Sequence, residues 1–153
     1  MKNFISLNGL FGLVTLLAAV TLEAGPSKAS MGECVVKVKE VVDLIKLKGN
    51  DEAIKQINEG KFSWKDSYVF IINTDGVTMG HPERKDHIGK NQIDLKDSNG
   101  LFFIKKFIEV AREKNEGWVT YMWPKPGEKT PSKKSTFVKK AGNLIVGAGI
   151  YTE

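Results

Sequence analysis

The chain has 153 residues, of which 41% are apolar and 27% charged, so it fits one soluble globular domain and is not disordered. Its net charge of +5 is spread along the sequence, and the densest basic cluster, Lys125 to Lys140, lies in or beside a Pro/Gly loop. A nucleic-acid-binding face needs a concentrated basic patch or a binding motif, so we predict no nucleic-acid partner.

The first 29 residues have the layout of a secretory signal peptide. Lys2 is followed by an apolar run from Phe4 to Leu22, and small-residue cleavage patterns precede Gly25 and Ser30. We therefore predict a signal peptide over residues 1–29 and one periplasmic or secreted domain over residues 30–153. The alternative is an anchor formed by an uncleaved N-terminal helix, because the run approaches the length needed to span a bilayer.

Two helices are expected after this segment. Apolar residues recur at steps of three and four from Cys34 to Ile45, which predicts a long amphipathic helix ending at Gly49. Asn50 is expected to cap a shorter second helix that ends at Gly60. The apolar stripe is expected to pack against the core, and a dimer interface is its alternative role.

A β-hairpin is predicted next. Tyr68 to Ile72 is an aromatic and β-branched run, Asn73 to Gly76 is a turn signal, and a second short run from Val77 to His81 is closed by Pro82.

The rest of the chain predicts one helix and three strands. Residues 83–99 are charged and irregular, and Asp97 or Ser98 is expected to cap a helix whose apolar side runs from Leu101 to Ala111. Strands are expected at residues 118–123, 135–140 and 144–151. This order predicts an α+β fold, a five-stranded antiparallel sheet with a long N-terminal helix and further helices packed on it.

No set of residues in the sequence requires catalysis, a cofactor or a metal. The only cysteine, Cys34, precludes an internal disulfide and is interpreted as a small apolar residue, with a reactive thiol as the alternative. The two histidines, His81 and His87, have no Cys-x-x-Cys partner, so a metal site is not predicted. The glycines from Gly147 to Gly149 precede no helix, so they predict close packing within a sheet rather than phosphate binding.

A binding site for a small organic acid is predicted instead. Aromatic residues recur at strand positions near Lys134 and Lys139, and a sheet lined by rings and a cation can bind a carboxylate. The alternative is that the rings are ordinary core or surface residues and the lysines are solvated. The predicted ligand-binding residues are Trp64, Tyr68, His81, Tyr121, Trp123, Lys134 and Phe137.

Ordered motifs over residues 34–151 resemble the single Cache type 2 family. They include the runs at 62–70, 88–91, 117–124 and 131–139, with His81-Pro82 and the last strand. The resemblance implies a PAS-like antiparallel sheet behind a long helix, in an extracytoplasmic sensor domain for short-chain carboxylates. It also implies that the seven residues named above lie in or near the pocket. The sequence departs from the family at Met79-Gly80, where Leu-Ala is more usual.

Three functions follow as hypotheses. The first is a non-enzymatic sensor domain which, because the sequence stops at Glu153, is expected to be free-standing and to signal through a separate membrane receptor, kinase or transporter. The second is a structural or interaction subunit that dimerises through its N-terminal helix and has a vestigial pocket. The third is a thiol-dependent enzyme that uses Cys34.

Overall fold

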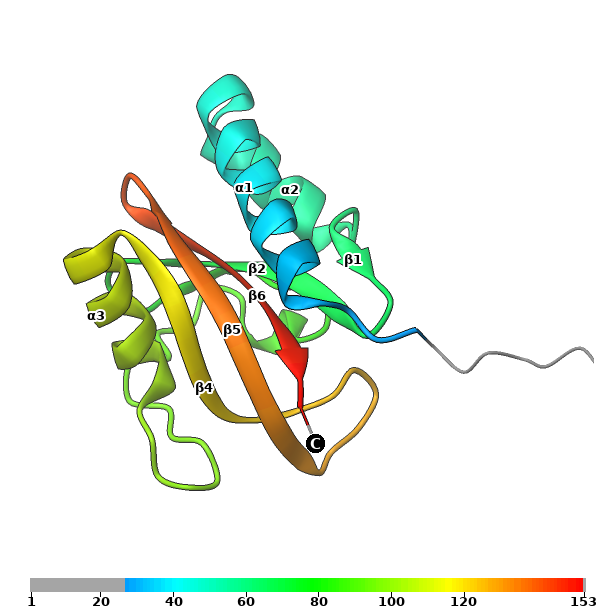
Figure 1. Ribbon diagram of the computed structural model, residues 1–153. Coiled ribbons are helices and arrows are strands. Elements are labelled where there is room, and N and C mark those ends of the chain that lie inside the picture. Colours follow the sequence, from blue (N-terminus) through cyan, green and yellow to red (C-terminus); the bar gives the residue numbers. More distant parts are fainter. Residues whose placement is uncertain (1–26, 153) are drawn as a thin grey trace, which may run out of the picture.

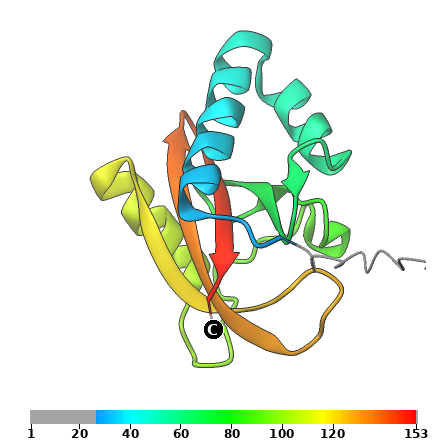
Figure 2. The ribbon, with the colours of Figure 1, turned by 45° about the vertical axis from the view of Figure 1, so that its right-hand side comes forward.

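The computed structural model describes residues 27–152, and these fold into an α+β domain in which helices cover both faces of one antiparallel sheet (Figures 1 and 2). The predicted signal peptide lies almost wholly outside the described residues. Within residues 27–152, no helix has the length and apolarity that crossing a bilayer requires. The helices are α1 (Met31–Lys48), α2 (Asn50–Asn58), the 3-10 helix η1 (Lys85–His87) and α3 (Phe103–Lys114). The strands are β1 (Ser63–Trp64), β2 (Ser67–Asn73), β3 (Thr78–Gly80), β4 (Glu116–Pro124), β5 (Pro131–Ala141) and β6 (Leu144–Tyr151).

The sheet has six strands in the order β1-β2-β6-β5-β4, with β3 also paired to β2. The antiparallel α+β fold and the β2–β3 hairpin are confirmed, whereas the expected number of five strands is wrong. The extra strand is β1, whose two residues pair with Ser67 and Tyr68. Two residues are too few to produce the alternation of apolar and polar side chains from which a strand is predicted.

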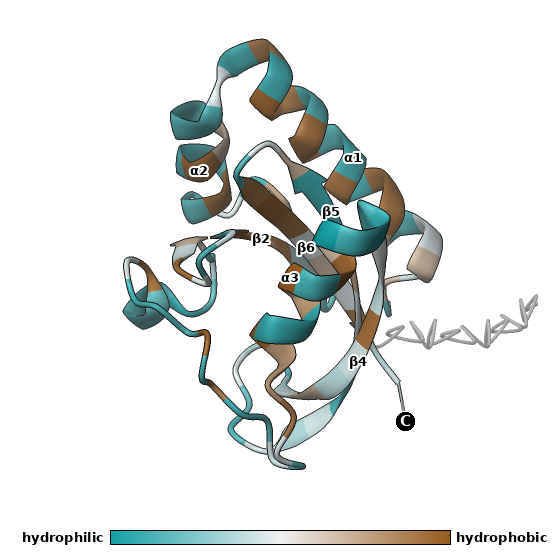
Figure 3. Cartoon of the chain, turned by 90° about the vertical axis from the view of Figure 1, so that its left-hand side faces the viewer, coloured by the Kyte–Doolittle hydropathy of each residue, from teal (hydrophilic) through white to brown (hydrophobic). Residues whose placement is uncertain are grey.

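The N-terminal helix α1 forms as its apolar stripe predicts. Cys34, Val38, Val41 and Val42 are buried against the sheet, and Figure 3 shows the apolar side of α1 turned toward the strands. Its start is fixed by a capping box in which Ser30 and Glu33 each accept a hydrogen bond from the other's backbone N–H, at 3.2 and 2.8 Å.

The predicted caps of the other two helices are wrong. Asn50 is already the first residue of α2, and Gly49, whose φ of 86° suits glycine, precedes it. Asp97 lies five residues before the Phe102 cap of α3. Its carboxylate accepts instead from the backbone N–H groups of Asn99, Leu101 and Met122, at 2.8–2.9 Å. Asp97 therefore ties the loop before α3 to strand β4.

The sheet separates two apolar cores. One core lies between the sheet and helices α1 and α2, and the other lies between the sheet and α3. Side chains of one strand alternate between the two cores, so Val69 and Ile71 enter the first while Tyr68, Phe70 and Ile72 enter the second.

The glycines of β6 are sites of close packing, as predicted. A Cβ atom on Gly147 would lie 2.5 Å from the Phe70 ring, and one on Gly149 would lie 2.3 Å from Oγ1 of Thr136. Because these positions lack side chains, rings from neighbouring strands can lie across β6 on the α3 side of the sheet.

Candidate ligand-binding site

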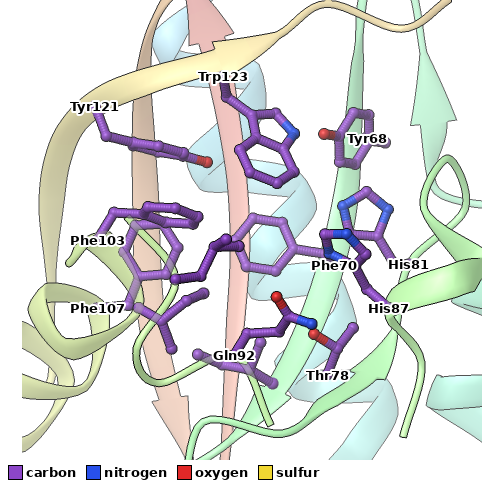
Figure 4. A pocket seen from close by; sticks show the side chains of 13 residues that line it. Tyr68, Phe70, Thr78, His81, His87, Gln92, Phe103, Phe107, Tyr121 and Trp123 are labelled. Carbon is purple, nitrogen blue, oxygen red and sulfur yellow. The ribbon is translucent and has the colours of Figure 1, made fainter. Parts of the chain in front are cut away.

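A cavity lies between the sheet and helix α3 (Figure 4). The cavity is partly open, and about 380 Å³ in and around it, open solvent included, is free of protein atoms. Its walls come from β2, β3, β4, α3 and the segment between β3 and α3. The residues that line it are Tyr68, Phe70, Ile72, Thr78, His81, His87, Gln92, Leu95, Phe103, Ile104, Phe107, Tyr121 and Trp123.

The α3 side of the cavity is an aromatic floor. The rings of Phe103 and Tyr121 are stacked with centroids 4.6 Å apart, and Phe107 meets each of them edge to face at 5.7 and 5.3 Å. Phe70 adds a fourth ring 5.7 Å from Phe107. Such contacts fix the rings and exclude water, so this part of the cavity suits a short apolar group.

Lys134 lies directly behind the cavity wall and is fully buried. Its Nζ donates to the Tyr68 hydroxyl at 3.0 Å and lies 4.1 and 4.8 Å from the ring centroids of Tyr68 and Tyr151. Among residues 27–152 it forms no ion pair with a carboxylate. A buried ammonium without a carboxylate is unusual because desolvating a charge is costly.

Tyr68 connects Lys134 to the cavity. Its hydroxyl oxygen accepts a hydrogen bond from Lys134, so its own O–H remains able to donate. Figure 4 shows this hydroxyl and the indole nitrogen of Trp123 turned toward one another at the same end of the cavity.

His81 presents a second donor because its tautomer is fixed. Nδ1 accepts from the backbone N–H groups of Glu83 and Arg84 at 3.2 and 3.0 Å, so the proton of the neutral ring lies on Nε2. Burial, followed by repulsion from Lys134, lowers the pKa of His81 to about 3. His81 is therefore a neutral N–H donor at physiological pH.

The rim of the cavity is held by a charged cluster. Arg84 donates to both oxygens of Asp86 at 2.9 Å and to Nε2 of His87 at 2.5 Å. Its guanidinium lies 5.7 Å from the Trp123 ring, and the His87 ring meets Trp123 edge to face at 6.0 Å. Burial, together with the Arg84 charge, lowers the pKa of His87. These contacts fix Trp123 where it closes one side of the cavity.

The structure brings together five of the seven predicted ligand-binding residues. Tyr68, His81, Tyr121 and Trp123 line the cavity, and Lys134 is one hydrogen bond away from it. Lys139, considered as a second cation, is instead paired with Glu116.

Trp64 and Phe137 lie on the opposite face of the sheet, in the core beneath α1, and do not line the cavity. Phe137 is paired with Trp118, which alternation places on the face of β4 opposite to Tyr121 and Trp123. The expectation that these two residues lie in or near the pocket is therefore wrong.

Several lining residues were missed by the sequence prediction, chiefly Phe70, Thr78, His87, Gln92, Phe103 and Phe107. Phe103 and Phe107 recur at a helical step of four, which predicts a core-facing stripe but does not show that a cavity lies beneath it. Tyr151 does not line the cavity, but its ring lies against Lys134, and the sequence prediction missed it too. It alternates with Gly147 and Gly149 along β6, so it lies on the same face of the sheet as these glycines.

The described residues do not support a metal or thiol site. Within residues 27–152, no group of three or more His, Cys, Asp or Glu side chains is placed to hold a metal ion. Cys34 is buried, and this burial raises the pKa of its thiol to about 11. A thiol that stays protonated is a poor nucleophile, so Cys34 is a core residue.

The antiparallel sheet with helices on both faces and a cavity on its α3 side is a PAS-like arrangement. The sequence profile described as Cache domain matches residues 32–153, so the chain belongs to the Cache domain family.

The chain is similar to the sensor histidine kinase MctS of Rhizobium johnstonii, with 32% identity over 110 residues, which are 68% of this chain and 24% of the kinase. The chain thus spans about a quarter of that relative's length. Two solved structures share its fold at 24% identity. One is a periplasmic sensor domain of a chemotaxis protein, with a TM-score of 0.65 over 78% of this chain and 88% of that one. The other is a Cache chemosensory domain described by its carboxylic acid recognition, with a TM-score of 0.64 over 80% and 85%.

Proposed function

We propose that this Cache domain is an extracytoplasmic sensor that binds a short-chain carboxylate in the cavity and signals through a receptor, kinase or transporter partner. The observation that carries the proposal is the fully buried Lys134 ammonium, which has no carboxylate partner among the described residues and donates to Tyr68 at 3.0 Å. A ligand carboxylate beside Tyr68 would supply the missing negative charge.

The polar groups at this end of the cavity favour an acceptor ligand. Tyr68 O–H and His81 Nε2–H are both donors, and the indole N–H of Trp123 can only donate. A carboxylate has only acceptor oxygens, so it satisfies all three groups, whereas an ammonium ligand would meet donors and a second positive charge. The aromatic floor beside these donors would contact the short apolar part of such a ligand.

The comparisons support the sensing role and the compartment. The curated relative is a sensor kinase, one solved relative is a periplasmic sensor domain, and another is described by its carboxylic acid recognition. We propose that residues 1–29 direct export, that residues 30–153 form the sensing domain, and that the domain acts by binding rather than by catalysis.

Thermal unfolding of the purified protein tests the ligand class. Acetate, propionate, pyruvate and lactate are compared with acetamide and propionamide, which match two of the acids in size but lack the charge. Because a ligand that binds the native state raises stability, at least one acid is expected to raise Tm while its amide has a smaller effect. If none of the acids shifts Tm, the proposal is wrong.

A structural subunit that dimerises through α1 is the second candidate. Val36 and Leu47 on the outward side of α1 are 55% and 81% exposed, so a second copy of the chain could cover them. Light scattering with and without the acids separates the two functions. A constitutive dimer that responds to none of the acids favours the structural role.

A further inference from the structure

Tyr151, the last residue of β6, makes contacts at both ends of its side chain. Its register partner on β5 is Lys134, so the two side chains lie beside one another on the α3 side of the sheet. The ring lies under the Lys134 ammonium, with Nζ 4.8 Å from its centroid, and the hydroxyl donates to the Pro124 carbonyl oxygen at 2.8 Å. Tyr151 is 6% exposed and is not among the residues that line the cavity.

The ring of Tyr151 restricts where the Lys134 charge can lie. Lysine has a flexible four-carbon side chain, so a buried ammonium needs contacts that select one position. Here the rings of Tyr68 and Tyr151 both contact Nζ, at 4.1 and 4.8 Å, and the Tyr68 hydroxyl accepts from it. Attraction between the ammonium and the ring of Tyr151 therefore helps to hold the charge against Tyr68.

The hydroxyl of Tyr151 fixes a different part of the site. Burial raises the pKa of Tyr151 above its usual range, so the group remains an O–H donor. Its acceptor, Pro124, directly follows Trp123, which closes one side of the cavity. The two ends of Tyr151 thus serve two functions, the ring for the cation and the hydroxyl for the aromatic wall.

We propose that Tyr151 is a positioning residue that sets the preference of the cavity for an anionic over a neutral ligand. The proposal rests on the carboxylate function proposed above. Tyr151 acts through Lys134, because without its ring the ammonium is free to move away from Tyr68. The ligand carboxylate then experiences a weaker positive potential, while a neutral ligand is affected only by the change in packing.

Titration calorimetry with propionate and propionamide tests this role in the wild type, Tyr151→Phe and Tyr151→Leu. Tyr151→Phe keeps the ring and is expected to keep the ratio of the two affinities within about twofold. Tyr151→Leu is expected to lower the propionate-to-propionamide ratio about fivefold, which corresponds to about 1 kcal/mol of selective binding free energy. Tyr121→Leu is the matched control, since it removes a lining tyrosine without contact to Lys134 and should weaken both ligands alike.

An unchanged ratio in Tyr151→Leu would show that Tyr151 is a packing residue and overturn the proposal. If Tyr151→Leu does not fold, Tyr151→Phe decides, because a loss of charge preference with the ring still present contradicts the role given to the ring. If the wild type binds no carboxylate, the proposed function itself fails. That result is distinct from a wild type that binds propionate with a preference independent of Tyr151.

Discussion

Lys134→Met is expected to weaken ligand binding strongly while leaving the stability of the protein almost unchanged. Methionine matches the length of the lysine side chain without its charge. In the wild type, the desolvation cost of the ammonium, several kcal/mol, is largely offset by a charged hydrogen bond of about 1.5–3 kcal/mol and two ring contacts of about 1 kcal/mol each. The free energy of unfolding should therefore change by no more than about 1 kcal/mol, or about 4 °C in Tm.

The effect on binding is much larger. The Tyr68 hydroxyl is 3.0 Å from Nζ, and a carboxylate bonded to that hydroxyl would lie about 6 Å from the lysine charge. At that separation and an effective dielectric constant of about 20, the attraction is about 3 kcal/mol, so propionate should bind about a hundredfold more weakly. Propionamide should bind about as well as it does to the wild type.

Thermal unfolding at a fixed propionate concentration measures both effects. At about 100 times the wild-type Kd, the ligand stabilises the wild type by about 2.7 kcal/mol but stabilises Lys134→Met by only about 0.4 kcal/mol. Lys139→Met is the matched control, because Lys139 lies on the same strand but is paired with Glu116. The reasoning is refuted if Lys134→Met keeps the full propionate shift, or if it destabilises the protein by more than about 3 kcal/mol without ligand.

Three further substitutions, two of them with a matched control, test other parts of the structure. The pKa of His81 is about 3 in the folded protein and near 6.5 when unfolded, so the unfolded state takes up a proton first as the pH falls. Stability should then decrease by up to about 1.4 kcal/mol per pH unit below pH 6.5, and urea titrations at pH 7 and 5 should show a shallower decrease in His81→Gln. Gly147→Ala should cost about 2 kcal/mol, because the new methyl would lie 2.5 Å from a phenyl ring, while Gly32→Ala, with open space inside a helix, should be neutral or stabilising. Asp97→Ala should cost about 2 kcal/mol in urea unfolding because three backbone N–H groups lose their acceptor, and Asp94→Ala, which removes an exposed ion pair, should cost less than about 0.5 kcal/mol.

The sequence was sufficient to predict the longer helices and strands, because their signals are local. The stripe from Cys34 to Ile45 defined α1, and the run from Tyr68 to Ile72 with its Asx/Gly turn defined the hairpin. The glycines of β6 were also interpreted correctly as close packing. The cap assigned to Asp97 was wrong because the same side chain can accept from a helix start or from a distant strand, and only tertiary structure decides between them.

Only part of the candidate site was predicted. Alternation shows which side chains of one strand share a face of the sheet, but it does not show which side chains of two different strands share a face. Tyr121 and Trp123 were correctly placed together since both lie on β4. Phe137 lies on β5, and its face depends on a register that the length of the Pro124–Pro131 connection does not reveal. Lys134, three residues before Phe137, therefore faces the cavity side while Phe137 faces α1.

The central position of β6 has a consequence for how the chain folds. Strand β2 ends at residue 73, yet its long pairing is with residues 144–148, and β6 also completes the pairing of β5. The sheet cannot close until these last residues have left the ribosome, and contacts of such long sequence separation form slowly. The nascent chain should therefore remain incompletely folded, with the edge of β2 unpaired, until β6 arrives. Pulse-labelling hydrogen exchange would show this as late, simultaneous protection of β2 and β6.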